Sequence, residues 1–370
     1  LEASHPDLYA FTDSAAWNQA VAHAYKGIEN GDTYAGFSRK ISQLLGSLKD
    51  SHTVLNFSDL LDYQIGEMQH ILPMKIFSDS TGMYVREDMT GLIPAGAEIV
   101  SVNGVSAEEL TQGLRDFSCA EGFSPVGTTR VADAIFYEVA GLLLPISRYN
   151  SVVICRTDSA ESDTINYKAL NDKEFDVMRE VYFMDPRKQI NRDFYLKIDR
   201  KLGLGILKVG SFAPPDNKKY TRFLDRSFEM LSDEQIPNMV IDLRGNMGGS
   251  SANVEELTSY LIEDGYNTPS NIIARQSELA RSRSNRFVMA FSRFILRTFY
   301  RGNEDLQAYL DAMSLDNGEQ DTLYFHEPLV QKKDLVFKGN KFLMINGLTA
   351  SAGVDMTHAF KKHRIGTIVG

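Results

Sequence analysis

The stretch Met239-Val-Ile-Asp-Leu-Arg-Gly-Asn-Met-Gly-Gly249 decides the fold class of this chain. In it an apolar run leads directly into a glycine-rich loop, and a helical pattern of apolar residues follows from Val254. A second unit repeats this order, because the apolar run 342–345 leads into the loop 346–353 and then into a helix. Strands that alternate with helices indicate an α/β layer with parallel strands, in which reactive groups collect in the loops after the strands.

Both loops carry groups that suit the stabilisation of negative charge. Gly248 and Gly249 allow backbone N–H groups to converge on an anion. Ser351 stands at a helix start, where unpaired backbone donors stabilise a developing charge. Each loop also has an ordinary interpretation, which is a tight turn in the first case and a helix cap by Thr349 or Ser351 in the second.

Together the two segments resemble the signature segments of one serine peptidase family, that of the C-terminal processing peptidases and the tricorn core protease. The resemblance implies a ClpP/crotonase-like layered α/β catalytic domain with Ser351 as the nucleophile. It also implies an oxyanion hole formed by the backbone N–H of Ala352 with that of Gly248 or Gly249. The chain order agrees with the family, since a helical region, an Asp-x-His-Thr loop at 50–53 and a PDZ-like stretch precede the catalytic segments.

A serine hydroxyl is a weak nucleophile and needs a base. By resemblance, one branch of the family uses a lysine beyond the nucleophile's helix, and the other uses a histidine preceded by serine ahead of the PDZ-like domain. Ser51-His52 occupies the second place, so we expect His52 to be the base. The alternative is that His52 is a loop residue that closes the helical unit. His358 lies two helical turns after Ser351 and should not reach its hydroxyl.

The third catalytic residue of the tricorn branch is a carboxylate downstream of the serine, so we expect it beyond Gly370. Asp50 is close to His52 in sequence, but its role is left open. The first hypothesis is a serine endopeptidase that cleaves peptides or unfolded protein tails through an acyl-enzyme. The alternative is a catalytically inert peptide-binding scaffold of the same fold. A crotonase-like acyl-transfer enzyme shares the layering but leaves the PDZ-like stretch unexplained.

The order of helical and strand patterns along the chain indicates an α/β catalytic domain combined with a PDZ-like, mostly β domain and an N-terminal helical unit. The PDZ-like prediction depends on the run Ala97-Glu-Ile-Val-Ser-Val-Asn-Gly104 ahead of an acidic helix start, in which Glu98 replaces the usual Asp. The expected regions are the helical region 1–65, the PDZ-like domain 66–172 with a helical insertion 117–150, and the catalytic domain 173–370 with an insertion at about 270–330 and a truncated C-terminus.

Composition limits the partners of the chain. The 39 Lys and Arg against 49 Asp and Glu give a net charge of −10, which argues against nucleic acid as a partner. The two cysteines exclude a disulfide framework and a Cys-based zinc site. No His/Asp/Glu set shows the spacing of metal ligands, so we predict no metal and no cofactor. The expected partner is a peptide or unfolded protein substrate, membrane contact is not expected, and homo-oligomerisation is left open.

A basic amphipathic segment lies between the two signature segments. Its arginines share one helical side at Arg286, Arg293, Arg297 and Arg301. We interpret it as a helix with a solvated basic face, with an active-site lid or a membrane-surface contact as the alternatives. Resemblance to bacterial members implies a periplasmic or cell-surface location, and residue 1 is Leu, so any signal would precede the visible chain.

Overall fold

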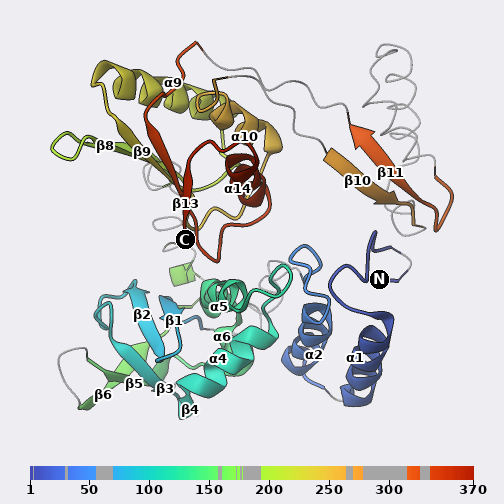
Figure 1. The fold of residues 1–370 in the computed structure, drawn as a ribbon. Helices are drawn as coiled ribbons and strands as arrows, with labels where there is room; N and C mark the ends of the chain where they lie inside the picture. The colour runs from blue at the N-terminus through green and yellow to red at the C-terminus, as the bar shows by residue number, and fades with distance from the viewer. Residues whose placement is uncertain are drawn as a thin grey trace.

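The computed structural model describes residues 1–2, 4–29, 32–55, 70–156, 161–171, 173–175, 177, 193–263, 270–277, 315–325 and 334–370. Two larger sheets, each with helices beside it, come from separate parts of the chain (Figure 1). The predicted basic helix at 286–301 lies outside the described residues, as does most of the predicted insertion at about 270–330. In the described residues, no helix has both the length and the apolar character needed to cross a membrane.

The N-terminal part contains helices α1 (Ser14–Gly27) and α2 (Tyr34–Gly46). Asp13 caps α1 by accepting a hydrogen bond from the N–H of Ala16 at 2.7 Å. Trp17 is buried against Leu8 and Leu48, which closes a small apolar cluster at this end of the chain. The loop that carries His52 follows α2 directly.

The first large sheet is antiparallel, with the order β1-β2-β3-β5-β6 and with β4 paired to β3. Its strands are β1 (Met74–Ser78), β2 (Met83–Asp88), β3 (Glu98–Val102), β4 (Val105–Ser106), β5 (Tyr149–Cys155) and β6 (Ser162–Lys168). The turn between β3 and β4 has positive φ at Asn103 (50°) and Gly104 (82°), as the predicted Asn-Gly turn requires. Ser106 then forms a capping box with Glu109 at the start of α4 (Ala107–Asp116).

Helices α5 (Pro125–Ala134) and α6 (Phe136–Leu143) fall in the segment 117–150 that the sequence analysis treats as an insertion. The segment is helical, yet its apolar side chains belong to the core of the first sheet. Phe136 and Val139 are fully buried in one cluster with residues of β1, β2 and β3. The two helices therefore stabilise this sheet by burying its face.

The second large sheet has the order β13-β12-β9-β8-β7, and only the β7–β8 pair is antiparallel. Its strands are β7 (Phe194–Asp199), β8 (Leu204–Val209), β9 (Asn238–Asp242), β12 (Asn340–Met344) and β13 (Thr367–Val369). The helices that accompany it are α9 (Asn217–Asp233), α10 (Ser251–Thr258) and α14 (Ala352–Lys362). The predicted α/β layer with parallel strands is confirmed.

The register of this sheet brings the two signature loops together. Lys208 on β8 pairs with Asp242 on β9, and Asp242 pairs with Met344 on β12. Because the three strands are parallel, their carboxyl ends meet at one edge of the sheet. The loops that follow β9 and β12 therefore start side by side. A separate hairpin of β10 (Ser270–Arg275) and β11 (Gln320–Phe325) comes from the predicted insertion.

Candidate active site

The two loops are joined to each other by hydrogen bonds. The N–H of Gly245 donates to Asn346 Oδ1 at 2.9 Å. The hydroxyl of Thr349 donates to the carbonyl oxygen of Leu243 at 3.1 Å. Since one partner of each bond lies after β9 and the other after β12, neither loop can move without the other.

Asn246 is the central tie between these loops. Its side chain is fully buried, and Nδ2 donates to the carbonyl oxygen of Val209 at 3.1 Å. Its Oδ1 accepts the N–H of Gly248 at 2.8 Å, and its own carbonyl oxygen accepts the N–H of Ala350 at 3.0 Å. One residue thus fixes the end of β8, the glycine turn and the residue before Ser351.

Ser351 has an unusual backbone conformation, with φ at 50° and ψ at −124°. A helix-capping residue has extended backbone and accepts a hydrogen bond on its side chain. Ser351 does neither, and Thr349 uses its hydroxyl to join the loops, so the capping interpretation is wrong. Within the described part of the chain, no hydrogen bond engages the Ser351 hydroxyl. Strained backbone at an exposed, unengaged serine is typical of a functional position.

Gly248 and Gly249 approach other backbone segments so closely that no side chain fits. A Cβ on Gly248 would lie 2.6 Å from Ser351 Cβ and 2.9 Å from the nitrogen of Ala352. A Cβ on Gly249 would lie 2.2 Å from the carbonyl carbon of Phe212. Both glycines also have positive φ, at 107° and 139°. The glycine turn is therefore shaped around the space beside Ser351.

The backbone donors of this turn differ in availability. The N–H of Gly248 is engaged by Asn246 Oδ1, whereas the N–H groups of Gly249 and Ala352 meet no acceptor among the described residues. Phe212 pairs with the turn by donating to the carbonyl oxygen of Gly248 at 2.8 Å and by accepting from Ser250 at 2.9 Å. In such a parallel bridge the N–H of Gly249 points away from the paired segment. Of the two glycines considered from the sequence, Gly249 keeps the free donor.

A cluster of charges holds the start of the glycine loop. Arg244 forms a bidentate pair with Asp242, with Nε 3.0 Å from Oδ1 and Nη2 2.8 Å from Oδ2. Lys208 Nζ lies 3.3 Å from Asp242 Oδ1 and donates to the carbonyl oxygen of Arg244 at 2.5 Å. Burial alone would raise the pKa of Asp242, but the hydrogen bonds from Arg244 and the charge of Lys208 outweigh it and hold the pKa below its usual value.

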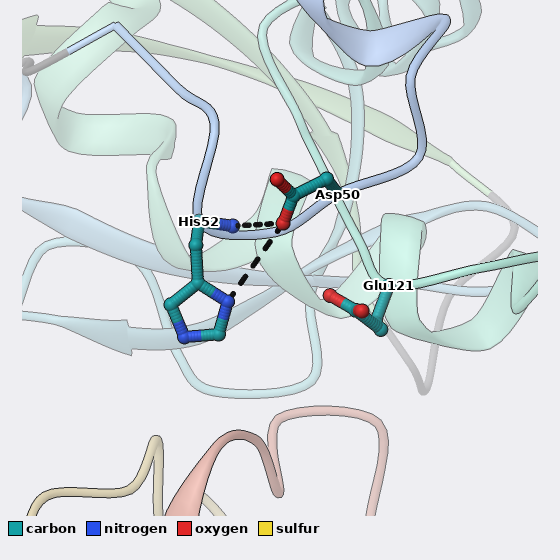
Figure 2. Close-up of side chains that lie close together, drawn as sticks. All are labelled: Asp50, His52 and Glu121. Carbon is teal, nitrogen blue, oxygen red and sulfur yellow. Dashed lines mark hydrogen bonds and ion pairs between the residues drawn. The ribbon is translucent and has the colours of Figure 1, made fainter. Parts of the chain in front are cut away.

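His52 lies in the loop after α2 with 68% of its side chain exposed. Its backbone N–H donates to Asp50 Oδ1 at 2.9 Å, and its Nδ1 lies 3.3 Å from Ser51 Oγ. Figure 2 shows its ring directed away from the loop, with Asp50 and Glu121 on one side. No hydrogen bond joins His52 to Ser351, although both residues are described.

Asp50, His52 and Glu121 form a group whose ligand atoms all lie within 4.8 Å of one another. An imidazole and two carboxylates have the chemistry to hold a metal ion, and the sequence spacing does not predict this group. Both carboxylates are already engaged, because Asp50 Oδ2 accepts from His5 at 2.8 Å and Glu121 Oε2 accepts from Ser51 at 2.7 Å. These hydrogen bonds hold the His52 loop to the N-terminal segment and to the residues before α5.

Helix α5 connects the His52 loop with the Ser351 loop. A Cβ on Gly347 would lie 2.9 Å from Arg130 Cγ and 3.0 Å from Val126 Cγ1, so this loop packs directly on α5. The residues just before α5 contact the other loop, since the N–H of Gly122 donates to the carbonyl oxygen of Lys49 at 2.8 Å. The Ser351 loop thus lies against α5, and the His52 loop lies against the residues just before this helix.

Comparison with known proteins identifies the region that contains Ser351. A family model described as peptidase family S41 matches residues 203–370. Residues 203–370 belong to peptidase family S41. The chain therefore carries the domain of a serine peptidase, and the match includes Gly248, Gly249, Ser351 and Ala352. No curated protein matches the chain by sequence.

Solved structures extend the likeness beyond the S41 segment. A crystal structure of a CPAF mutant is 12% identical with a TM-score of 0.63, and the match covers 99% of this chain and 79% of the CPAF chain. Mature CPAF is 13% identical with a TM-score of 0.61, and the match again covers 99% of this chain and 79% of that one. Mature CPAF complexed with lactacystin is 12% identical with a TM-score of 0.58, and the match covers 95% of this chain and 78% of that one. At this identity the likeness shows a shared fold across nearly the whole chain.

The family resemblance already implies that Asn246 shapes the glycine loop, and its buried amide bonds to the backbone of that loop. The contact of Glu121 with Ser51 is absent from the sequence-based candidates. For Glu121 there was no local signal, since 70 residues separate it from Ser51.

Proposed function

We propose that the chain is a serine endopeptidase that cleaves peptides or unfolded protein tails through an acyl-enzyme at Ser351. One observation carries this proposal. Ser351 stands in strained backbone with an unengaged hydroxyl, directly beside a glycine turn that leaves no room for a side chain. The match of this region to family S41 supports the same chemistry.

In the proposed reaction, Ser351 Oγ attacks the carbonyl carbon of the scissile bond while its proton passes to His52 Nε2. The carbonyl oxygen becomes an oxyanion that accepts hydrogen bonds from the N–H groups of Gly249 and Ala352. His52 then donates the proton to the leaving amine nitrogen as the C–N bond breaks. Water then attacks the acyl-enzyme ester while His52 takes its proton, and His52 returns a proton to Ser351 Oγ as the ester bond breaks.

His52 must approach Ser351 when substrate binds. Its side chain is free to do so because 68% of it is exposed. Catalytic hydrogen bonds are often long or absent before substrate arrives, so the open geometry agrees with this role. Burial raises the pKa of Cys119 to about 11, so this thiol does not compete as the nucleophile.

The antiparallel sheet with α4 is proposed to be a PDZ-like domain that presents or gates substrate, next to the N-terminal helical unit. The hairpin β3–β4 followed by a capped helix supports this comparison. A periplasmic or cell-surface location remains a prediction. The inert peptide-binding scaffold remains the alternative, since no hydrogen bond joins His52 to Ser351.

The experiment that tests the proposed function is covalent labelling of the full-length protein with a fluorophosphonate. An activated serine loses its proton to the base and forms an O–P bond as the P–F bond breaks and fluoride leaves, whereas a serine without a base stays unreactive. We expect label on the peptide that contains Ser351, and Ser351→Ala should abolish both labelling and peptide cleavage. His52→Ala should slow labelling by orders of magnitude.

Thr357→Ala provides the control, because this hydroxyl sits on α14 but donates to the carbonyl oxygen of Gly353 at 2.8 Å. It should label like the parent protein. Retention of full peptide cleavage by Ser351→Ala would show that the proposed mechanism is wrong and would favour the inert scaffold.

A further inference from the structure

A cavity of about 590 Å³ lies between the N-terminal helices and the residues that lead into α5. Helices α2 and α5 both contact α4 (Figure 1), and residues of all three helices line the cavity. Its volume is within the range of about 300–1,000 Å³ that is typical of ligand sites. The lining includes His23, Gln43, Lys49, Arg115, Asp116 and Phe123. The cavity is separate from the Ser351 loop and has no role in the reaction described above.

The charges that face this cavity are mainly positive. Lys49 and Arg115 line it, and neither forms an ion pair with a carboxylate in the described part of the chain. The carboxylate in the lining belongs to Asp116, whose Oδ2 accepts hydrogen bonds from Nε and Nη2 of Arg39, so its charge is balanced. The whole chain has a net charge of −10, so a cationic cavity is a local exception that attracts anions.

Lys49 stands in left-handed backbone, with φ at 57°. A residue with a Cβ is strained in this conformation, and glycine or asparagine is the usual residue there after a helix. The carbonyl oxygen of Lys49 accepts the N–H of Gly122 at 2.8 Å, which holds the residue against the opposite wall. Its Nζ lies 3.8 Å from the ring centroid of Phe123. Strain at a lysine whose ammonium is held in a cavity indicates that the side chain has a function.

Both cations keep donors for a ligand. An ammonium has three N–H donors, and the ring face of Phe123 occupies one side of the Lys49 ammonium. Arg115 has five donors, of which Nη2 donates to Thr129 Oγ1 at 3.3 Å. The charge of Arg115 also acts on Asp133, but this carboxylate is already paired with Arg130 at 2.8 Å. A point charge beside a planar fork of donors suits carboxylate groups.

We propose that this cavity binds an acidic segment of a protein substrate, whose carboxylates contact Lys49 and Arg115. The other lining groups fit a peptide, because Phe123 is 72% exposed and can contact the methylene groups of acidic side chains. The amide of Gln43 can bond to a peptide backbone. A small inorganic anion would use neither group.

The place of the cavity in the fold connects it with the active site. Lys49 lies three residues before His52, and α5 begins at the cavity with Pro125. The Ser351 loop packs on the same helix, since a Cβ on Gly347 would lie 3.0 Å from Val126 Cγ1. A substrate held in the cavity therefore lies beside both candidate catalytic loops. The assignment to a substrate rests on the proposed function, whereas the binding of an acidic peptide does not.

The first test measures, by fluorescence anisotropy, the binding of a fluorescein-labelled hexaglutamate to the full-length protein carrying Ser351→Ala, which prevents cleavage. The matching hexaglutamine should bind at least about tenfold more weakly, because its amides form no charge-assisted hydrogen bonds with the two cations. Higher ionic strength should weaken the binding of hexaglutamate, since the charge of the exposed Arg115 is screened. Equal affinity for the two peptides would overturn the inference. Tighter binding of a single-stranded oligonucleotide of equal charge would overturn the assignment to an acidic peptide.

The second test locates the binding site with variants. Lys49→Asn and Arg115→Gln each remove one cation and should each weaken binding by about fivefold, the upper range for an exposed charge pair. Because asparagine tolerates left-handed backbone, Lys49→Asn should unfold at no lower a urea concentration than the parent protein. Arg200→Gln is the matched control, since it removes an exposed cation from the turn after β7, outside the cavity, and should bind like the parent. An equal loss in Arg200→Gln would show general charge attraction and overturn the inference.

Gln43→Glu tests the same location without removing a cation. Gln43 is exposed on α2 and lines the cavity, so a carboxylate there should repel hexaglutamate and weaken its binding several-fold. Unchanged affinity in this variant would show that the peptide does not bind in this cavity.

The cavity and the proposed function fail separately. If Ser351 labels with fluorophosphonate and hexaglutamate does not bind, the proposed function stands and the inference about the cavity is refuted. If hexaglutamate binds as expected and Ser351 does not label, the acidic-peptide site stands, and its link to a substrate fails together with the proposed function.

Discussion

Gly248 lies directly against Ser351, with the position of its missing Cβ only 2.6 Å from Ser351 Cβ. The same position is 2.9 Å from the nitrogen of Ala352, one of the two free donors of the proposed oxyanion hole. A glycine here does more than permit a positive φ of 107°. It leaves open the space in which a substrate carbonyl would stand between nucleophile and donor.

Gly248→Ala should therefore cripple the site. The methyl group would displace Ser351 or block the approach of a carbonyl, so we expect fluorophosphonate labelling to fall by at least about 100-fold, the scale of losing one oxyanion donor. Gly245→Ala is the matched control, because Gly245 also has positive φ (78°) but a Cβ there meets nothing within 4 Å. Gly245→Ala should lose about 1–2 kcal/mol in stability from the positive φ. Gly248→Ala should lose more, because its methyl group also collides with the Ser351 loop, and only this variant should lose labelling.

The N–H of Gly249 should be a transition-state donor. An amide-to-ester replacement at residue 249 removes this N–H and adds no side chain, which matters because a Cβ would collide with Phe212 at 2.2 Å. Loss of one oxyanion donor typically costs about 2.7–4 kcal/mol in the barrier. We expect kcat for peptide cleavage to fall by about 10²–10³-fold, with little change in KM. Unchanged kcat would remove Gly249 from the mechanism.

The sequence predicts the elements of the site better than their contacts. The two strand-loop-helix units and the serine at the start of α14 follow from local patterns and from the family resemblance. The conformation of Ser351 does not, because a serine before a helix ordinarily caps it, and only the packing of Gly248 and Asn246 against the loop excludes that state. The contact between Glu121 and Ser51 depends on how α5 packs, which no local pattern encodes.

Asn246 should be a major stabilising residue of the catalytic sheet. Its side chain is fully buried and bonds both the carbonyl oxygen of Val209 and the N–H of Gly248. Asn246→Ala leaves these two groups without partners, so unfolding in urea should show a loss of about 1–3 kcal/mol for each unsatisfied group. Asn238→Ala at the start of β9 is the control. Its bond with Asn340 is exposed and its bond to the carbonyl oxygen of Gly203 is only partly buried, so their loss should cost much less. Equal losses in the two variants would contradict this role.

Stability should fall in acid partly through Asp242. The pKa of Asp242 in the folded protein lies below its usual value of 3.8, so the ionised carboxylate stabilises the fold above that pH. This stabilisation is lost as the pH falls through the pKa of the folded state. Lys208 stays protonated throughout this acid range and adds no pH dependence there. Asp242→Asn should lower the free energy of unfolding at pH 7 and flatten its decrease below about pH 4. Urea titrations from pH 2 to 7 measure the difference, and parallel curves for the two proteins would show that Asp242 contributes nothing.

His52 should close on Ser351 when the site is occupied. No hydrogen bond joins the two residues here. The His52 ring is exposed on a loop that contacts the residues just before α5, and the Ser351 loop lies against α5 itself. A phosphonate bound to Ser351 mimics the tetrahedral intermediate, whose charge favours a protonated, donating imidazole. A crystal structure of this adduct should place His52 Nε2 within about 3.2 Å of Ser351 Oγ or of the leaving-group oxygen. A ring that remains more than about 10 Å away, beyond any hydrogen bond or single bridging water, would rule out His52 as the base, and a lysine would become the leading candidate.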